Sequence, residues 1–136
     1  MSDPRVIYIA GPYRSPTRRG LRRNIRRAQQ AAAVLWLSGH VPVCPHTYTW
    51  PYKDLLPEST WLPRLIALML KCDGVLLLGG WTHSEGTRAE VRAALSHNLP
   101  VYNCPHAAAV TRLTVSPEYL EECMRQYELL NPPLPR

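Results

Sequence analysis

Short apolar runs alternate with amphipathic stretches along the chain. The run at 5–10 is rich in β-branched and aromatic residues, which predicts a buried strand. Shorter runs of the same kind follow at 41–44, 75–78 and 100–103. Between them, apolar residues at helical spacing predict helices at about 21–38, 59–72, 84–97 and 117–129. The segment 45–57, rich in proline and aromatic residues, is expected to be a loop that covers a pocket.

Strands and helices that alternate in this way form βαβ units, which assemble into a parallel sheet with helices on both faces. We therefore expect one α/β domain over residues 1–136, with residues 130–136 as an extended tail. Its expected fold is a doubly wound, flavodoxin- or Rossmann-like sheet of four to five strands. Ligands bind such sheets at the C-terminal ends of the strands. The loops expected there are 10–15, 44–46, 78–84 and 102–106.

Composition narrows the class of protein. The chain has 136 residues, of which 46% are hydrophobic, and this is enough for one core. No apolar run approaches the roughly 20 residues of a membrane helix, and the N-terminus lacks the layout of a signal peptide. We therefore expect a cytoplasmic protein whose four cysteines are reduced.

The net charge of +6 is unevenly placed. Seven arginines crowd one short stretch: Arg14, Arg18, Arg19, Arg22, Arg23, Arg26 and Arg27. Such a cluster attracts phosphate groups, either on a nucleic acid or on a small nucleotide. The alternative is a solvated helix face with no ligand.

The segment 78–90 follows the most apolar strand and opens the third predicted helix. Free backbone N–H groups at such a helix start form an anion site. Ser84 can cap the helix, bind a phosphate oxygen, or do both. Gly86 permits a ligand to approach the backbone closely. Glu90 lies one turn beyond Gly86 on the same helix face, so its carboxylate is a candidate functional group. Ordinary surface roles are expected for His83, Glu85 and Arg88.

Several short motifs keep one order along the chain. They are Tyr8-Ile9-Ala10-Gly11-Pro12-Tyr13-Arg14, Gly39-His40-Val41-Pro42, Pro45-His46, Cys72-Asp73 before the apolar strand, Gly80-Trp81 after it, and Ser84-x-Gly86-x-x-x-Glu90 running into Ala93. Together they resemble the nucleoside 2-deoxyribosyltransferase superfamily, in particular its short members, over roughly residues 6–101.

The resemblance implies a reaction and a set of site residues. Glu90 would attack C1′ of a ribose or deoxyribose and expel the base, as in a retaining glycosidase, with no metal or organic cofactor. Substrate contacts are implied for Tyr8, Gly11, Tyr13, Arg14, His46, Gly80, Trp81, Ser84 and Gly86. The partner expected is a nucleoside or nucleotide rather than a nucleic acid or a membrane, and the protein is expected to be a homodimer or larger homo-oligomer.

Ser84 distinguishes two branches of the superfamily. Transferases that act on free nucleosides tend to carry an acidic residue at this position, and that carboxylate would repel a phosphate. Serine there resembles the nucleoside 5′-monophosphate hydrolases, and Arg14, Arg18 or Arg19 could add a bidentate grip. We therefore expect an N-glycosidase acting on a nucleoside 5′-monophosphate. A deoxyribosyltransferase acting on free nucleosides is the alternative.

One position departs from the superfamily pattern. The usual proton donor to the leaving base would fall at Leu65, which cannot donate. Asp73 lies at the wrong end of its strand and is expected to cap or turn the chain. Substitute acids could be Asp54, His46 or His83. Otherwise the base leaves unassisted, which favours a protonatable base such as cytosine or adenine, or the protein is a non-catalytic nucleotide sensor.

Two further hypotheses concern the triplets Cys44-Pro45-His46 and Cys104-Pro105-His106. Four such side chains could bind zinc, but in a 2-1-3-4 sheet their strands lie roughly 14 Å apart, at about 4.8 Å per step. A zinc site is therefore not expected. Cys44 or Cys104 could act as a nucleophile near a positive site, although packing roles are favoured for both. Binding of RNA or DNA by the arginine-rich helix is a third hypothesis, after the glycosidase and the sensor.

Overall fold

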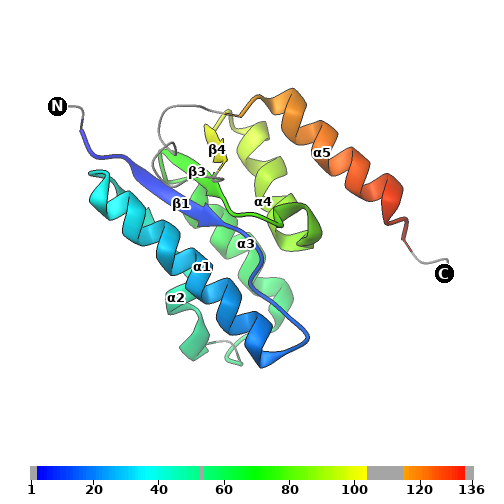
Figure 1. Cartoon of the computed structure of the whole chain (residues 1–136), viewed down its shortest axis with the longest axis horizontal. Coiled ribbons are helices and arrows are strands. Elements are labelled where there is room, and N and C mark those ends of the chain that lie inside the picture. Colours follow the sequence, from blue (N-terminus) through cyan, green and yellow to red (C-terminus); the bar gives the residue numbers. More distant parts are fainter. Residues whose placement is uncertain (1–2, 53, 104–114, 134–136) are drawn as a thin grey trace.

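A computed structural model of the chain describes residues 3–52, 54–103 and 115–133 (Figure 1). In chain order the elements are β1 (Val6–Ala10), α1 (Arg18–Leu37), β2 (Val41–Val43), α2 (Pro45–Tyr48), the 3-10 helix η1 (Trp50–Tyr52), α3 (Glu58–Met69), β3 (Gly74–Leu77), the 3-10 helix η2 (Trp81–His83), α4 (Glu85–Ser96), β4 (Val101–Asn103) and α5 (Pro117–Leu130). Among the described residues, no helix combines the length and apolar character needed to cross a bilayer.

The four strands form one sheet in the order β2-β1-β3-β4, and every neighbouring pair is parallel. Tyr8 in the middle of β1 pairs with Val43 on one side and Val75 on the other. The predicted α/β class and the doubly wound parallel sheet are therefore confirmed. The order also places β2 and β4 at opposite edges, with β1 and β3 in the centre.

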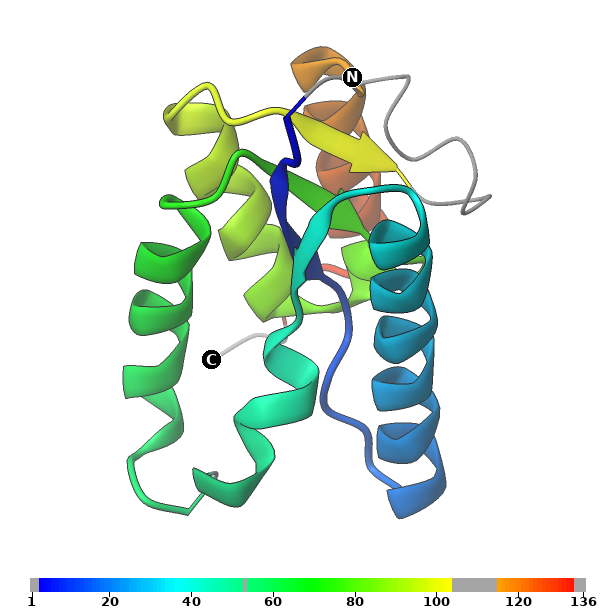
Figure 2. The same cartoon turned by 90° about the vertical axis from the view of Figure 1, so that its left-hand side faces the viewer.

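Both faces of the sheet are covered by helices. Ile7 and Ile9 of β1 pack against α1, whereas Tyr8 and Ala10 point to the other face and join a core with α3, α4 and α5. Figure 2 shows α1 on one side of the sheet and α3 and α4 on the other. Because neither face meets water, the central strands are apolar throughout instead of alternating with polar residues.

The predicted helices and strands are present, with shifted boundaries. α1 begins at Arg18, earlier than predicted, because the Thr17 side chain caps it by accepting from the Gly20 N–H at 3.0 Å. The prediction that 45–57 is entirely loop was wrong, since it contains α2 and η1. Pro45 stands in the first turn of α2, where its fixed φ suits a helix and its missing N–H costs nothing.

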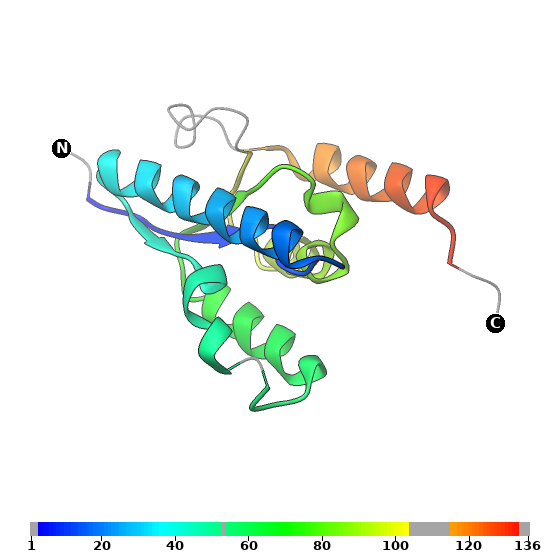
Figure 3. The ribbon, with the colours of Figure 1, turned by 60° about the horizontal axis from the view of Figure 1, so that its bottom comes forward.

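The N-terminal half of α1 projects beyond the sheet. Its first fully buried residue is Ala28, and none of residues 18–27 is buried to that extent. The three views agree that this half continues past the end of β1 (Figures 1, 2 and 3). Since the strands are parallel, this is the edge where all four strands end. Most of the arginine cluster therefore stands beside the loops in which a site was expected.

Asp73 lies at the opposite edge and has a structural role. Its Oδ2 accepts a hydrogen bond of 2.8 Å from the Val6 N–H, and its own N–H donates to the Val6 carbonyl at 2.8 Å. It thereby fixes the entry of β3 against β1. The expectation that Asp73 turns or caps the chain, far from the strand ends where ligands bind, agrees with this geometry.

Candidate functional site

The segment from β3 into α4 is shaped by a glycine and a cap. Gly80 has φ +81, in the left-handed region that glycine adopts without strain, and it leads into η2. Ser84 has extended backbone and caps α4, because its Oγ accepts from the Thr87 N–H at 3.2 Å. The predicted cap is confirmed, and it aims the start of α4 at the C-terminal edge of the sheet.

The hydroxyl of Ser84 is left with a proton to donate. Its oxygen accepts from the Thr87 N–H and, at 2.9 Å, from the Thr87 hydroxyl, so both lone pairs are used. Among the described residues, no acceptor takes the Ser84 proton. The backbone N–H groups of Glu85 and Gly86, in the first turn of α4, have no partner within the helix. These donors point outward together and can hold an anion.

Gly86 is not required by packing. Its φ is not positive, and a Cβ added there would meet only Leu62 Cδ1, at 3.8 Å. Gly11 differs, because an added Cβ would lie 2.7 Å from the Leu78 Cβ. Close packing of β1 and β3 therefore explains Gly11, whereas nothing in the described chain explains Gly86. A ligand that approaches the first turn of α4 would explain it.

Glu90 is buried against Tyr8. Glu90 is only 7% exposed, and its carboxylate interacts with the Tyr8 hydroxyl. Burial raises the pKa of Glu90 from the ordinary value of 4.5 to about 7, although the Tyr8 hydroxyl opposes that rise. Burial and the Glu90 charge also raise the pKa of Tyr8, so Tyr8 remains a proton donor.

The loop after β1 is held from two sides. Asn24 of α1 donates from Nδ2 to the carbonyls of Tyr13 and Arg14, at 3.1 and 3.3 Å. His46 of α2 places its Nε2 3.2 Å from the carbonyl oxygens of Gly11 and Pro12. The Tyr13 ring meets the His46 ring edge-on, with centroids 5.7 Å apart. These contacts present Tyr13 and the exposed Arg14 at the edge of the sheet where α4 begins.

His46 is fixed as a neutral donor. Both neighbours of its Nε2 are carbonyl oxygens, so Nε2 carries the proton and Nδ1 has only a lone pair. The side chain is 5% exposed, and this burial lowers its pKa, although the two carbonyls oppose the fall. A neutral imidazole whose one proton is already shared with the backbone is not arranged to protonate a leaving base. Its contacts instead position the loop at Gly11 and Pro12.

The other positions considered for the missing acid lie in three different parts of the chain. Leu65 of α3 packs against the core beneath the sheet. His83 is exposed, and its ring lies edge-on to Tyr127 of α5, with centroids 5.1 Å apart. Asp54 is exposed on the connection between η1 and α3. The ring of His83 thus contacts α5, whereas His46 contacts the loop after β1.

Trp81 is buried in the core formed by α3, α4, α5 and the sheet. Packing alone accounts for its large side chain, so its burial supports a structural role more directly than stacking on a base. Gly80, immediately before it, would place a Cβ 3.7 Å from Pro12. The two residues join η2 to the core and to the loop after β1.

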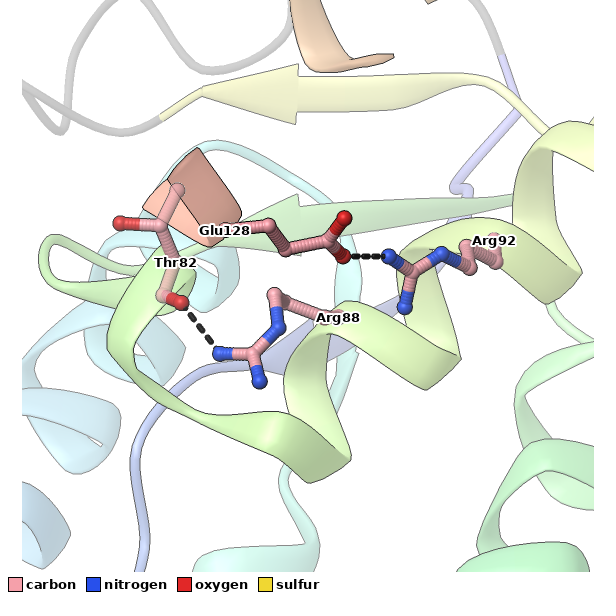
Figure 4. A network of polar contacts seen from close by, with 4 residues as sticks. All are labelled: Thr82, Arg88, Arg92 and Glu128. Atoms are coloured by element: carbon pink, nitrogen blue, oxygen red, sulfur yellow. Dashed lines mark hydrogen bonds and ion pairs between the residues drawn. The ribbon is translucent and has the colours of Figure 1, made fainter. Parts of the chain in front are cut away.

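α5 contacts residues 82–92, which we call the site segment, through side chains on its surface. Arg88 donates to the Thr82 carbonyl, and Arg92 pairs with Glu128 (Figure 4). The Arg88 guanidinium also lies 4.6 Å from the centre of the Tyr127 ring. Sequence reasoning missed this clamp and the loop anchor Asn24. Asn24 had a detectable signal, a polar residue on the otherwise apolar face of α1, whereas Tyr127 had none.

The cysteine and zinc hypotheses find no support among the described residues. No group of three or more His, Cys, Asp and Glu side chains there could hold a metal ion. Burial raises the pKa of the Cys44 thiol, although the bond with Thr47 opposes it, and this makes Cys44 a poor nucleophile. Cys104 and His106 lie outside the described residues, as do positions 134–136 of the predicted tail.

Comparison with known proteins gives one family match. No curated protein matches the chain in sequence. One family model matches residues 5–104, which include β1 through β4 and exclude α5; its description is a domain of unknown function, DUF7768. Since the match covers well over half of the chain, this protein belongs to the DUF7768 family.

Proposed function

We propose that the protein is an N-glycosidase that cleaves the bond between base and sugar of a nucleoside 5′-monophosphate. The observation that carries this proposal is the buried Glu90 carboxylate, which interacts with the Tyr8 hydroxyl and lies one turn along α4 from the free donors of Ser84, Glu85 and Gly86. The resemblance to the nucleoside 2-deoxyribosyltransferase superfamily supports the same reaction.

In the proposed first step, a carboxylate oxygen of Glu90 attacks C1′ as the bond from C1′ to the base nitrogen breaks. The electron pair of that bond leaves with the base, which takes up a proton. Water then attacks C1′ of the glycosyl ester, which releases the sugar phosphate and restores the carboxylate. Tyr8 stabilises the charged form of Glu90 before attack and keeps the attacking oxygen oriented.

The phosphate is assigned to the first turn of α4. The Ser84 hydroxyl and the N–H groups of Glu85 and Gly86 would donate to its oxygens, and the helix dipole favours its negative charge. Arg14 stands on the neighbouring loop, which Asn24 and His46 hold in place. An acidic residue at position 84 would repel the phosphate. Because this chain has serine there, we expect it to prefer a nucleoside 5′-monophosphate to the free nucleoside.

The preferred leaving base is expected to have a ring nitrogen that can be protonated without an acid from the protein. Leu65 occupies the position of the usual acid and cannot donate a proton, the Nε2 proton of His46 is shared with backbone carbonyls, and the His83 ring contacts Tyr127. A base with a protonatable ring nitrogen, such as cytosine or adenine, can accept a proton from water as it departs. Uracil and thymine should react more slowly.

The test is a panel of common nucleosides and their 5′-monophosphates, incubated with the protein with and without a second free base. Released or exchanged base is followed by chromatography. We expect release from monophosphates, loss of it in Glu90→Gln, and no change in Glu121→Gln, which alters an exposed carboxylate on α5. Base exchange on free nucleosides would instead support a deoxyribosyltransferase and contradict the role given to Ser84.

A second candidate is a nucleotide sensor without turnover. It is favoured because Leu65, which packs against the core at the position of the usual acid, cannot donate a proton. A sensor would bind a 5′-monophosphate through the same donors at the start of α4 without releasing its base. Calorimetry on the same panel separates the two functions. Binding without base release, equally strong in Glu90→Gln, would favour the sensor.

A further inference from the structure

One stripe of α1 changes from arginines to an aromatic residue along its length. Arg18, Arg22, Arg26, Gln29, Ala33 and Trp36 follow at spacings of three and four residues, so they share one side of the helix. All six are exposed. The buried residues of α1, which are Ala28, Ala31 and Leu35, lie on its other side. The stripe spans about 27 Å at 1.5 Å per residue.

The arginines repel one another and therefore destabilise α1. Arg18 with Arg22 and Arg22 with Arg26 are like-charge pairs at four-residue spacing, and Arg19, Arg23 and Arg27 form a second such column. The first turn holds no acidic residue, so its positive charges also oppose the helix dipole. Among the described residues, none of these arginines of α1 has an ion-pair partner. An anionic partner would relieve this repulsion, and conflicts of this kind occur at functional surfaces.

The stripe leads into a groove at the edge of the sheet. The groove has a volume of about 440 Å³ and lies between α1, β2 and α2. Gln29, Ala33 and Trp36 line it from α1, and Pro42 and Tyr48 line it from the other side. The side chains of Trp36 and Tyr48 are 60% and 42% exposed, so each offers part of its ring to a ligand.

We propose that this surface binds single-stranded nucleic acid. The arginine half of α1 would hold successive phosphates, and one or two bases would stack on Trp36 and Tyr48. A basic track that ends at exposed aromatic rings is how sequence-independent single-strand binders work. A lone mononucleotide carries too little charge to neutralise two arginine columns, and an acidic peptide would leave the aromatic groove without a matching group. The arginines and Trp36 are exposed on α1, whereas Glu90 is buried on α4, so this proposal uses different residues and does not depend on the glycosidase.

The test is the binding of a fluorescein-labelled single-stranded oligonucleotide, followed by fluorescence anisotropy as salt is raised. If about four phosphates are neutralised, affinity should fall roughly fifty-fold between about 50 and 200 mM salt. The double variant Arg22→Gln/Arg26→Gln should bind at least tenfold more weakly at low salt and show a shallower salt dependence. Trp36→Ala should lose about fivefold or more in affinity at an unchanged salt slope.

Two controls keep this test separate from the proposed reaction. Arg125→Gln, which removes an arginine paired with Glu122 on α5, should bind like the wild type. Glu90→Gln should also bind normally, whatever its effect on base release. Failure to bind the oligonucleotide at low salt, or equal binding by the arginine variants, would overturn the proposal. So would binding of anionic vesicles or an acidic peptide in place of the oligonucleotide.

Discussion

The hydroxyl of Tyr8 in β1 interacts with the buried carboxylate of Glu90 in α4 and favours its charged form. Tyr8→Phe should therefore raise the Glu90 pKa above its value of about 7, by on the order of 1 pH unit. Titration of the carboxyl carbon by NMR measures this directly. Tyr119→Phe, which removes an exposed hydroxyl on α5, should leave the Glu90 pKa unchanged.

Glu90 also makes folding stability depend on pH. Its pKa is about 7 when folded and near 4.5 when exposed, so the folded state retains a proton that the unfolded chain loses between these values. The stabilising contribution is full below about pH 4.5 and declines as pH rises through about 7. The difference between these two pKa values corresponds to about 3 kcal/mol of folding free energy.

Glu90→Gln removes this titration while keeping the size of the side chain. Urea denaturation should therefore show the variant gaining about 3 kcal/mol relative to the wild type between pH 4.5 and pH 8. Comparing the two proteins at each pH cancels the contributions of all other titrating groups to the free energy of unfolding. A difference that stays constant across this range would mean that Glu90 is already ionised in the folded protein at low pH.

What the sequence predicts well is local. The cap at Ser84 follows from rules that involve only a few neighbouring residues. The parallel sheet follows from the alternation of strands and helices. The shared helix face of Glu90 and Gly86 is also a local relationship, whereas a functional role for Glu90 stays a prediction.

What the sequence does not predict is contact between distant segments. His46 reaches the Gly11 carbonyl across 35 residues, and no periodicity or spacing announces such a bond. For the same reason His46 was considered as an acid, although its surroundings fix it as a neutral donor. α2 was missed because its four residues are too few to show helical spacing.

His46 should stabilise the loop after β1. His46→Leu leaves the carbonyls of Gly11 and Pro12 without their donor in a buried place, and this should cost about 1–3 kcal/mol of folding free energy. His46→Gln retains an amide donor and should cost less. Urea denaturation measures both. Equal losses in the two variants would show that packing of the ring, and not its hydrogen bonds, supports the loop.

Tyr127 should hold the site segment in place from α5. Tyr127→Ala removes the ring that meets His83 and Arg88, which should cost about 1–2 kcal/mol and speed hydrogen exchange at residues 82–88. Tyr127→Phe keeps the ring and should behave like the wild type. Leu129→Ala, at an exposed position of the same helix, is the control. Unchanged exchange in Tyr127→Ala would mean that α4 alone fixes this segment.

Two glycine substitutions separate folding from binding. Gly11→Ala would bring a Cβ within 2.7 Å of the Leu78 Cβ, so it should destabilise the protein by about 1–3 kcal/mol. Gly86→Ala meets only Leu62 Cδ1 at 3.8 Å, so its stability should be unchanged or higher by up to about 1 kcal/mol, since alanine favours a helix.

Gly86→Ala should nevertheless weaken binding of a nucleoside 5′-monophosphate by tenfold or more, because its methyl group fills the space beside the N–H donors of α4. Thermal denaturation and calorimetry with the monophosphate measure the two effects separately. The corresponding free nucleoside is the matched ligand, and its binding should change much less. If Gly86→Ala binds the monophosphate as the wild type does, the phosphate is not held at the first turn of α4, and the preference for a 5′-monophosphate loses its structural basis.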